Sequence, residues 1–150
     1  MEVTVVRPKV MAISPGRISG YVLLTAEGRV LSAGYALDPE DIVGLMEEFL
    51  PEELVTATKK ETPGDWMKFA ALKNELASLF ADYAEALGIR VTVYHEDWTA
   101  QFPVRARWEE VNAAEERIRK ANPNLPQIGY VSAPLRLAVA HMLKNGTPVA

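Results

Sequence analysis

The chain has no cysteine, and this absence excludes several classes of protein at once. A disulfide-stapled fold, thiol catalysis and every cysteine-ligated zinc or iron–sulfur site are ruled out. Histidine is almost as scarce: His95 and His141 are the only two, which excludes a histidine-rich metal centre. The chemistry that remains open belongs to carboxylates, hydroxyls, cations and aromatic rings.

Long apolar runs are also missing. No run approaches the ~20 residues that a membrane-spanning helix needs. The opening residues, MEVTVVRPKV, lack the charged-then-apolar order of a signal peptide. The phosphate-binding, nucleophile-elbow and dinucleotide motifs (P-loop, G-x-S-x-G, G-x-G-x-x-G) are absent as well. We therefore expect a cytoplasmic protein with no membrane partner.

The composition that is present fits one globular domain over residues 1–150. The chain is 49% hydrophobic, and a chain of 150 residues buries about two thirds of its unfolded surface, so it needs no metal or disulfide to fold. Its net charge of −4 argues against a protein that coats nucleic acid indiscriminately. Residues 117–150, however, contain five Lys and Arg and no acid. One interpretation of this asymmetry is a surface that faces nucleic acid or an acidic partner. The other is the uneven charge distribution that is common in small domains.

The first third of the sequence predicts three strands, over residues 9–14, 19–25 and 29–36. Pro15-Gly16 ends the first strand, and Glu27-Gly28 forms a tight turn between the second and the third. Because so few residues separate the last two strands, they should pair antiparallel.

Helices and strands alternate over the rest of the chain. The first helix should begin at Pro39, with Asp38 as its N-cap, and the last should follow Ser132 and end near Asn145-Gly146. Between them we expect strands over 53–58 and 89–95 and helices over 66–87 and 103–121. The order β-β-β-α-β-α-β-α-α implies an α/β fold: a five-stranded mixed sheet with helices on both faces. Ligand sites of such sheets gather at the carboxyl ends of parallel strands, here near Ser14, Thr58 and Glu96.

Four short motifs, taken in this order, resemble the RuvC/YqgF branch of the ribonuclease H-like superfamily. Family members open with a strand that reads roughly I-D-P-G, followed by a strand that reads G-(Y/V/W)-A-(L/V). The YqgF type carries D-E-R-x-(S/T) after the fifth strand, and the last helix begins with an Asp followed by a run such as A-L-A-x-A. The matching runs here are Ser14-Pro15-Gly16, Gly20-Tyr21-Val22-Leu23, His95-Glu96-Asp97-Trp98-Thr99 and Leu135-Arg136-Leu137-Ala138-Val139-Ala140.

The resemblance implies a ribonuclease H-like fold whose catalytic site is degraded. Nucleases of this superfamily hold two divalent metals with clustered carboxylates. The first-strand Asp corresponds to Ser14, and the last-helix Asp corresponds to Leu135, or to Ser132 if the helix shifts by a turn. RuvC also has a Glu near the end of strand four, where this chain has Thr58-Lys59. Glu96 is the one carboxylate that matches, so we expect neither the usual two-metal cleavage nor a bound cofactor.

Glu96 is the remaining candidate catalytic residue and the only candidate metal ligand of the family set. Asp97 and His95 adjoin it, but successive strand residues point to opposite faces and need not converge. Glu96 can equally be a helix cap or an ion-pair partner, and His95 a packed or exposed side chain.

Several cations and two tryptophans are predicted around one rim of the sheet, because they follow strand ends or open the helix after strand five. The cations can contact phosphates, and Trp98 and Trp66 can stack on unpaired bases. Alternatively the tryptophans are core anchors and the cations ordinary solvated residues. The predicted phosphate-contacting residues are Arg17, Lys59, Lys60, Arg105 and Arg107.

Three functions remain open. The first is a nuclease-fold protein without two-metal activity that binds DNA or structured RNA. The second is an active, divergent endonuclease that uses Mg²⁺ or Mn²⁺ on Glu96 and Asp97, with Glu61 or Asp65 from the loop after strand four. The third is a non-catalytic interaction module, for which the 103–121 helix and the last helix would supply a homodimer face.

Overall fold

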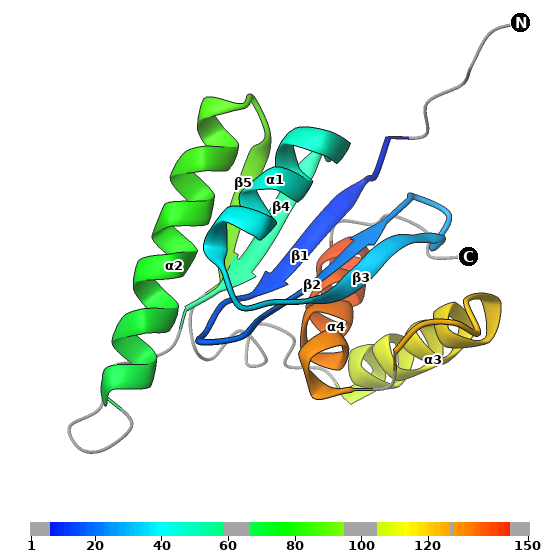
Figure 1. Ribbon diagram of the computed structural model, residues 1–150. Coiled ribbons are helices and arrows are strands. Elements are labelled where there is room, and N and C mark those ends of the chain that lie inside the picture. Colours follow the sequence, from blue (N-terminus) through cyan, green and yellow to red (C-terminus); the bar gives the residue numbers. More distant parts are fainter. Residues whose placement is uncertain (1–6, 59–66, 95–104, 127, 145–150) are drawn as a thin grey trace, which may run out of the picture.

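The computed structural model describes residues 7–58, 67–94, 105–126 and 128–144 (Figure 1). At positions 67–69 and 105–108 only the backbone is described.

The sheet has five strands in the spatial order β3-β2-β1-β4-β5. The central strand β1 pairs antiparallel with β2 and parallel with β4. Strand β2 in turn pairs antiparallel with β3, and β4 pairs parallel with β5. The mixed five-stranded sheet expected from the sequence is therefore confirmed. Its strands are β1 (Val10–Ser14), β2 (Ser19–Leu24), β3 (Val30–Ala36), β4 (Glu53–Ala57) and β5 (Arg90–Tyr94).

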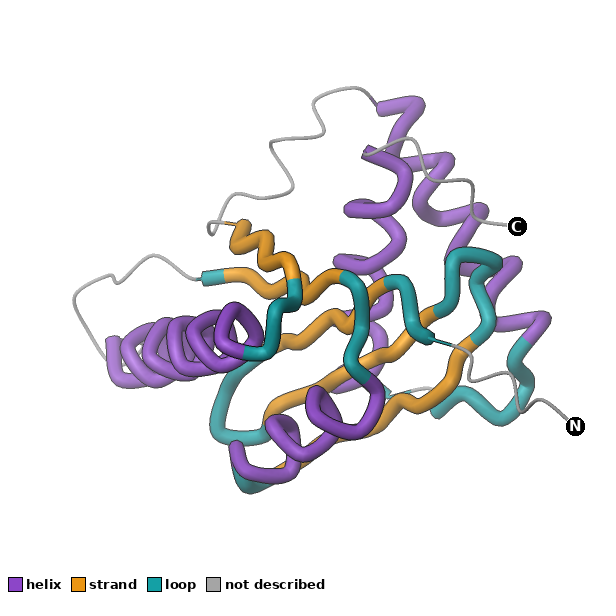
Figure 2. Tube along the Cα trace, turned by 90° about the horizontal axis from the view of Figure 1, so that it is seen from above, coloured by secondary structure: helices purple, strands orange, loops and turns teal. Residues whose placement is uncertain are grey.

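Two helices cover each face of the sheet, as predicted (Figure 2). Helices α1 (Pro39–Phe49) and α2 (Met67–Ala86) lie on one face, and α3 (Arg105–Ala121) and α4 (Gly129–Lys144) lie on the other. The predicted start of α1 is also confirmed, because the Asp38 side chain accepts a hydrogen bond of 3.0 Å from the Glu40 amide.

The core is divided by the sheet into two apolar layers. Val10 and Ala12 of β1 face α3 and α4, whereas Met11 and Ile13 face α1 and α2. All four side chains are fully buried, as expected for a central strand covered on both faces.

Helix α4 begins at Gly129, three residues before the predicted start at Ser132. The carbonyl of Ile128 accepts hydrogen bonds of 3.0 Å from the amides of both Val131 and Ser132, which forms the first turn earlier. Pro134 consequently lies inside the helix rather than at its start, and it has no amide hydrogen for the Tyr130 carbonyl. The Ser-Ala-Pro sequence is typical of a helix start, and this local signal made the prediction wrong.

The Tyr130 backbone packs directly on β2 at Gly20. A Cβ atom added at Gly20 would lie only 1.6 Å from the Tyr130 carbonyl oxygen. The glycine therefore permits a close approach between the first turn of α4 and the sheet.

None of the helices within the described ranges combines the length and the apolar character that a membrane span requires.

Candidate functional site

The candidate site lies at the carboxyl end of β1, where Ser14 is the last residue of the strand. Ser14 pairs with Gly20 of β2, and the turn over residues 15–18 joins the two strands. Ser19 holds this turn, since its hydroxyl accepts from the Gly16 amide and donates to the Gly16 carbonyl, each at 3.3 Å. Arg17 lies at the exposed part of this turn.

A lysine from α2 reaches Ser14. The Lys73 ammonium donates to the Ser14 hydroxyl at 3.4 Å and to the Pro15 carbonyl at 3.3 Å. Lys73 precedes the buried Leu76 by three residues, so it lies on the helix face that packs against the sheet. The position at which the resemblance places a metal-binding carboxylate therefore carries a neutral hydroxyl with an ammonium beside it.

Neither of the two positions that the resemblance aligns with the last-helix Asp, Leu135 and Ser132, provides a carboxylate. Leu135 is fully buried in the apolar cluster between the sheet and helices α3 and α4. The Ser132 hydroxyl accepts a hydrogen bond of 2.8 Å from the Arg119 guanidinium. Arg119 also pairs with Glu115 of the same helix, α3, at 3.5 Å from Nε to Oε1.

These positions do not fit a divalent cation. Mg²⁺ requires hard oxygen ligands, normally with one or more carboxylates, and it is repelled by a neighbouring ammonium or guanidinium. Among the residues that the structure describes, no three His, Cys, Asp or Glu side chains gather in a way that would hold a metal ion.

Many of the residues predicted for the site fall outside the described residues. Strands β4 and β5 end at Ala57 and Tyr94, which pair in register, and the next predicted site residues follow these ends in the sequence. Arg105 and Arg107 begin α3, where the backbone alone is described. The predicted residues that lie outside the described ranges are Lys59, Lys60, His95, Glu96, Asp97 and Trp98, together with Glu61, Asp65 and Trp66.

Lys73 was missed by the sequence analysis, although the sequence contains a signal for it. The helix over 66–87 has an apolar stripe that includes Leu76 and Phe80, and Lys73 falls on this stripe at helical spacing. A cation on the core-facing side of a helix needs a polar partner. The hydroxyl and carbonyl groups at the end of a neighbouring strand can supply it.

His141 of α4 is buried, with 3% of its surface exposed. Its Nδ1 lies 2.7 Å from the Tyr94 hydroxyl, and its Nε2 lies 3.4 Å from Oε2 of Glu53. A carboxylate can only accept, so the neutral ring carries its proton on Nε2 and Nδ1 accepts from Tyr94. This cluster ties the end of α4 to strands β4 and β5.

Burial lowers the pKa of His141 from its ordinary 6.5, and the Glu53 carboxylate opposes this shift without overcoming it. Lys144 of α4 and Lys9, which precedes β1, lower the His141 pKa further. Burial also raises the pKa of Tyr94, and Glu53 adds to that increase. The buried cluster therefore favours a neutral imidazole and a protonated phenol.

The stability of the protein should consequently fall as the pH drops below about 6.5. The unfolded chain binds a proton on His141 more readily than the folded chain does, so acid favours unfolding, by at most about 1.4 kcal/mol per pH unit. Urea unfolding followed by circular dichroism between pH 5.5 and 7.5 measures this effect. His141→Gln should flatten the profile, because it removes the buried imidazole. An unchanged profile in His141→Gln would contradict this assignment.

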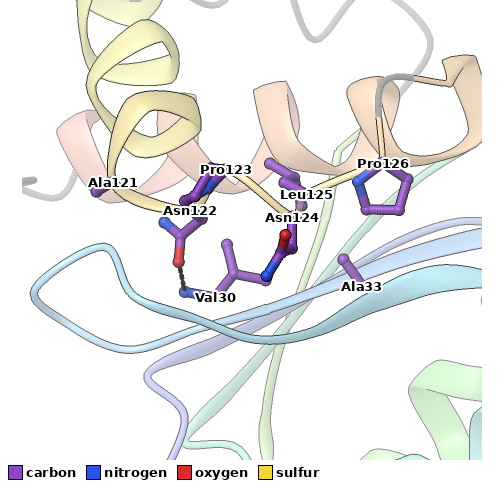
Figure 3. Close-up of a pocket in the computed structure, with 8 residues that line it drawn as sticks. All are labelled: Val30, Ala33, Ala121, Asn122, Pro123, Asn124, Leu125 and Pro126. Atoms are coloured by element: carbon purple, nitrogen blue, oxygen red, sulfur yellow. Dashed lines mark hydrogen bonds between the residues drawn. The ribbon is translucent and has the colours of Figure 1, made fainter.

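A pocket of about 320 Å³ lies beside the first half of β3, away from the end of the strand that is in register with Ser14 (Figure 3). Asn122, after the end of α3, accepts a hydrogen bond of 3.1 Å from the Val30 amide and donates to the carbonyls of Gly28 and Ile118. The segment from Ala121 to Pro126 lines the pocket together with Val30 and Ala33, and none of these side chains is titratable. Asn122 thus fastens the β2–β3 hairpin to α3, and the pocket is separate from the Ser14 edge.

The fold is that of the RuvC-like branch of the ribonuclease H-like proteins. No protein-family model and no curated protein matches the sequence. Solved structures do match. RuvC of T. thermophilus in complex with a Holliday junction substrate is 16% identical with a TM-score of 0.65, and the match covers 92% of this chain and 96% of that one.

Two further structures agree with this result. Another Thermus thermophilus RuvC structure is 15% identical with a TM-score of 0.65 over the same shares of the two chains. The yeast mitochondrial Holliday junction resolvase is 9% identical with a TM-score of 0.56, covering 95% of this chain and 83% of that one. At these identities the likeness establishes the fold.

Proposed function

We propose that this chain is a nucleic-acid-binding protein with a RuvC-like fold that does not perform two-metal phosphodiester cleavage. The observation that carries the proposal is the Lys73 ammonium beside the Ser14 hydroxyl at the carboxyl end of β1. Two-metal catalysis needs carboxylates there to hold the cations that stabilise the attacking and leaving oxygens. An ammonium cannot hold a metal ion, but it suits the phosphate oxygens of a nucleic acid backbone.

The ligand we propose is branched or otherwise structured DNA or RNA. RuvC of T. thermophilus has been solved with a Holliday junction substrate, which makes branched DNA the first ligand to test. In this chain Lys73 and Arg17 would contact phosphates at the Ser14 edge. The same proposal includes two further kinds of contact. Phosphates would also be contacted by Lys59, Lys60, Arg105 and Arg107, and Trp98 would stack on a base.

Binding should be measured by fluorescence anisotropy against a four-way DNA junction, a DNA duplex and a structured RNA at low and moderate salt. We expect binding at micromolar protein or below that weakens as salt rises, because phosphate contacts release counterions. Lys73→Ala and Arg17→Ala should each weaken binding and reduce the salt slope by about one. Arg90→Ala is the matched control, since the Arg90 side chain is 70% exposed but lies at the amino end of β5.

The other outcomes separate the remaining functions. No binding to any of the three ligands at micromolar protein would overturn the proposal. With a dimer seen by light scattering, that result would favour the non-catalytic interaction module. Cleavage in Mg²⁺ or Mn²⁺ that is lost in Glu96→Gln would favour a divergent endonuclease.

A further inference from the structure

Two tyrosines form an exposed aromatic pair at the edge of the sheet. Tyr35, near the end of β3, is 55% exposed, and Tyr130, in the first turn of α4, is 44% exposed. Their ring centroids are 5.7 Å apart, and the ring planes are tilted by 43°. The two rings therefore form an open angle rather than a closed stack.

This pair lies at the same edge and on the same face as Ser14. Ser14 pairs with Gly20, and Gly20 pairs with Tyr35, so the three residues form one row across β1, β2 and β3. Paired residues of neighbouring strands point to the same face, and two strand spacings make about 10 Å between the Cα atoms of Ser14 and Tyr35. Tyr130 reaches this row because its backbone rests on Gly20.

Between the rings and the start of α4 lies an apolar notch of about 550 Å³. It is lined by Tyr35, Ile128, Gly129 and Tyr130, and Ile128 is itself 39% exposed. Gly129 contributes no side chain, and a Cβ atom added there would meet nothing within 4 Å. The notch is thus open to a flat ligand, and none of the residues that line it carries a charge.

The size and surroundings of this surface favour a nucleobase over a second copy of the chain. A stable protein interface takes about 20–30 residues from each side, and this notch offers four. The first turn of α4 contains no acidic residue, residues 117–150 contain none at all, and Arg17 is exposed in the turn that leads into β2. An apolar aromatic surface at the same sheet edge as the exposed Arg17 suits a base whose backbone phosphates lie nearby.

We infer that the Tyr35–Tyr130 notch binds an unpaired nucleobase. This inference rests on the proposed function and adds to it the class of nucleic acid that the protein prefers, namely one with unpaired bases next to its phosphate contacts. One tyrosine ring stacks on the face of the base, and the other, tilted by 43°, borders its edge.

The test compares a single-stranded oligodeoxynucleotide that contains 2-aminopurine with the blunt duplex of the same sequence. The wild-type protein should quench the 2-aminopurine emission on binding. The double substitution Tyr35→Ala with Tyr130→Ala should abolish the quenching and weaken binding to the single strand about 5-fold to 150-fold, which corresponds to roughly 1–3 kcal/mol for one stacked base. Binding to the blunt duplex should change little.

Three further variants separate stacking from general damage. Tyr83→Ala removes a tyrosine of similar exposure, 41%, from α2 on the opposite face, and it should leave binding unchanged. Tyr35→Phe with Tyr130→Phe should keep most of the affinity, because the rings remain. Gly129→Leu should weaken single-strand binding by filling part of the notch, since a Cβ atom at this position meets nothing within 4 Å.

Failure of the notch inference can be distinguished from failure of the proposed function. If the wild-type protein binds the duplex or a four-way junction but the double alanine variant binds the single strand equally well, the notch is not a base site and the proposed function stands. If the double variant instead loses a dimer seen by sedimentation, the notch is a protein interface and the inference is wrong. If the wild-type protein binds no nucleic acid, the proposed function and this inference both fail.

Discussion

Replacing Gly20 by alanine should destabilise the protein by about 3 kcal/mol, and the melting temperature should fall by roughly 6–12 °C. The added Cβ would lie 1.6 Å from the carbonyl oxygen of Tyr130 and 2.6 Å from its carbonyl carbon. Both are backbone atoms, so no side-chain rotation can relieve the clash, and the first turn of α4 must move away from the sheet. Because α4 covers much of one face of the sheet, this movement also loosens the apolar layer beneath it.

Gly44→Ala is the matched control for this prediction. Gly44 lies within α1, is exposed, and has nothing within 4 Å of an added Cβ. Alanine is the better helix former, so this variant should gain about 0.5–1 kcal/mol. Thermal and urea unfolding of the two variants measure the contrast. A Gly20→Ala protein as stable as the wild type would show that α4 does not rest on β2 in this way.

Two of the described positions that the resemblance aligns with metal-binding carboxylates, Ser14 and Leu135, should respond in opposite ways to an introduced Asp. Ser14→Asp places a carboxylate next to the Lys73 ammonium, so it should be neutral or stabilising by up to about 1 kcal/mol, less at high salt. Leu135→Asp places a carboxylate inside a fully buried apolar cluster, so it should cost more than about 4 kcal/mol. That loss approaches the whole stability of many domains.

Leu135→Met is the control, because it keeps the volume and apolar character of the side chain and should cost less than about 1.5 kcal/mol. Urea unfolding with and without Mn²⁺ measures each variant. Mn²⁺ should leave the wild type, Ser14→Asp and Leu135→Asp unchanged. Recovery of Leu135→Asp stability on adding Mn²⁺ would instead show that position 135 reaches a metal site.

The element order could be predicted because its signals are local in the sequence. Asp38-Pro39 marked the start of α1. The helix expected over 66–87 stops just before Gly88, whose φ of +79° suits glycine. The start of α4 was missed because Ser132 and Pro134 are typical of a helix start. The hydrogen bonds to the Ile128 carbonyl that form the actual first turn are not visible in the sequence.

The site could be predicted only in part, because its contacts join distant parts of the chain. The sequence indicated the carboxyl end of β1 through the Ser14-Pro15-Gly16 run, but Lys73 lies 59 positions away in the chain. The Tyr35–Tyr130 pair depends on the register of three strands and on how closely α4 approaches Gly20. The burial of His141 likewise depends on which face α4 presents to Tyr94 and Glu53.

The proposal that this chain does not perform two-metal cleavage is tested most directly by a labelled four-way DNA junction incubated with the wild-type protein in Mg²⁺ or Mn²⁺. A native gel measures the bound fraction, and a denaturing gel of the same sample measures strand cleavage. We expect the junction to be bound, equally in EDTA and in either metal, and its strands to remain intact, since Lys73 stands beside Ser14 where a metal-binding carboxylate would be needed. Metal-dependent cleavage at defined positions, lost in Glu96→Gln, would contradict this account.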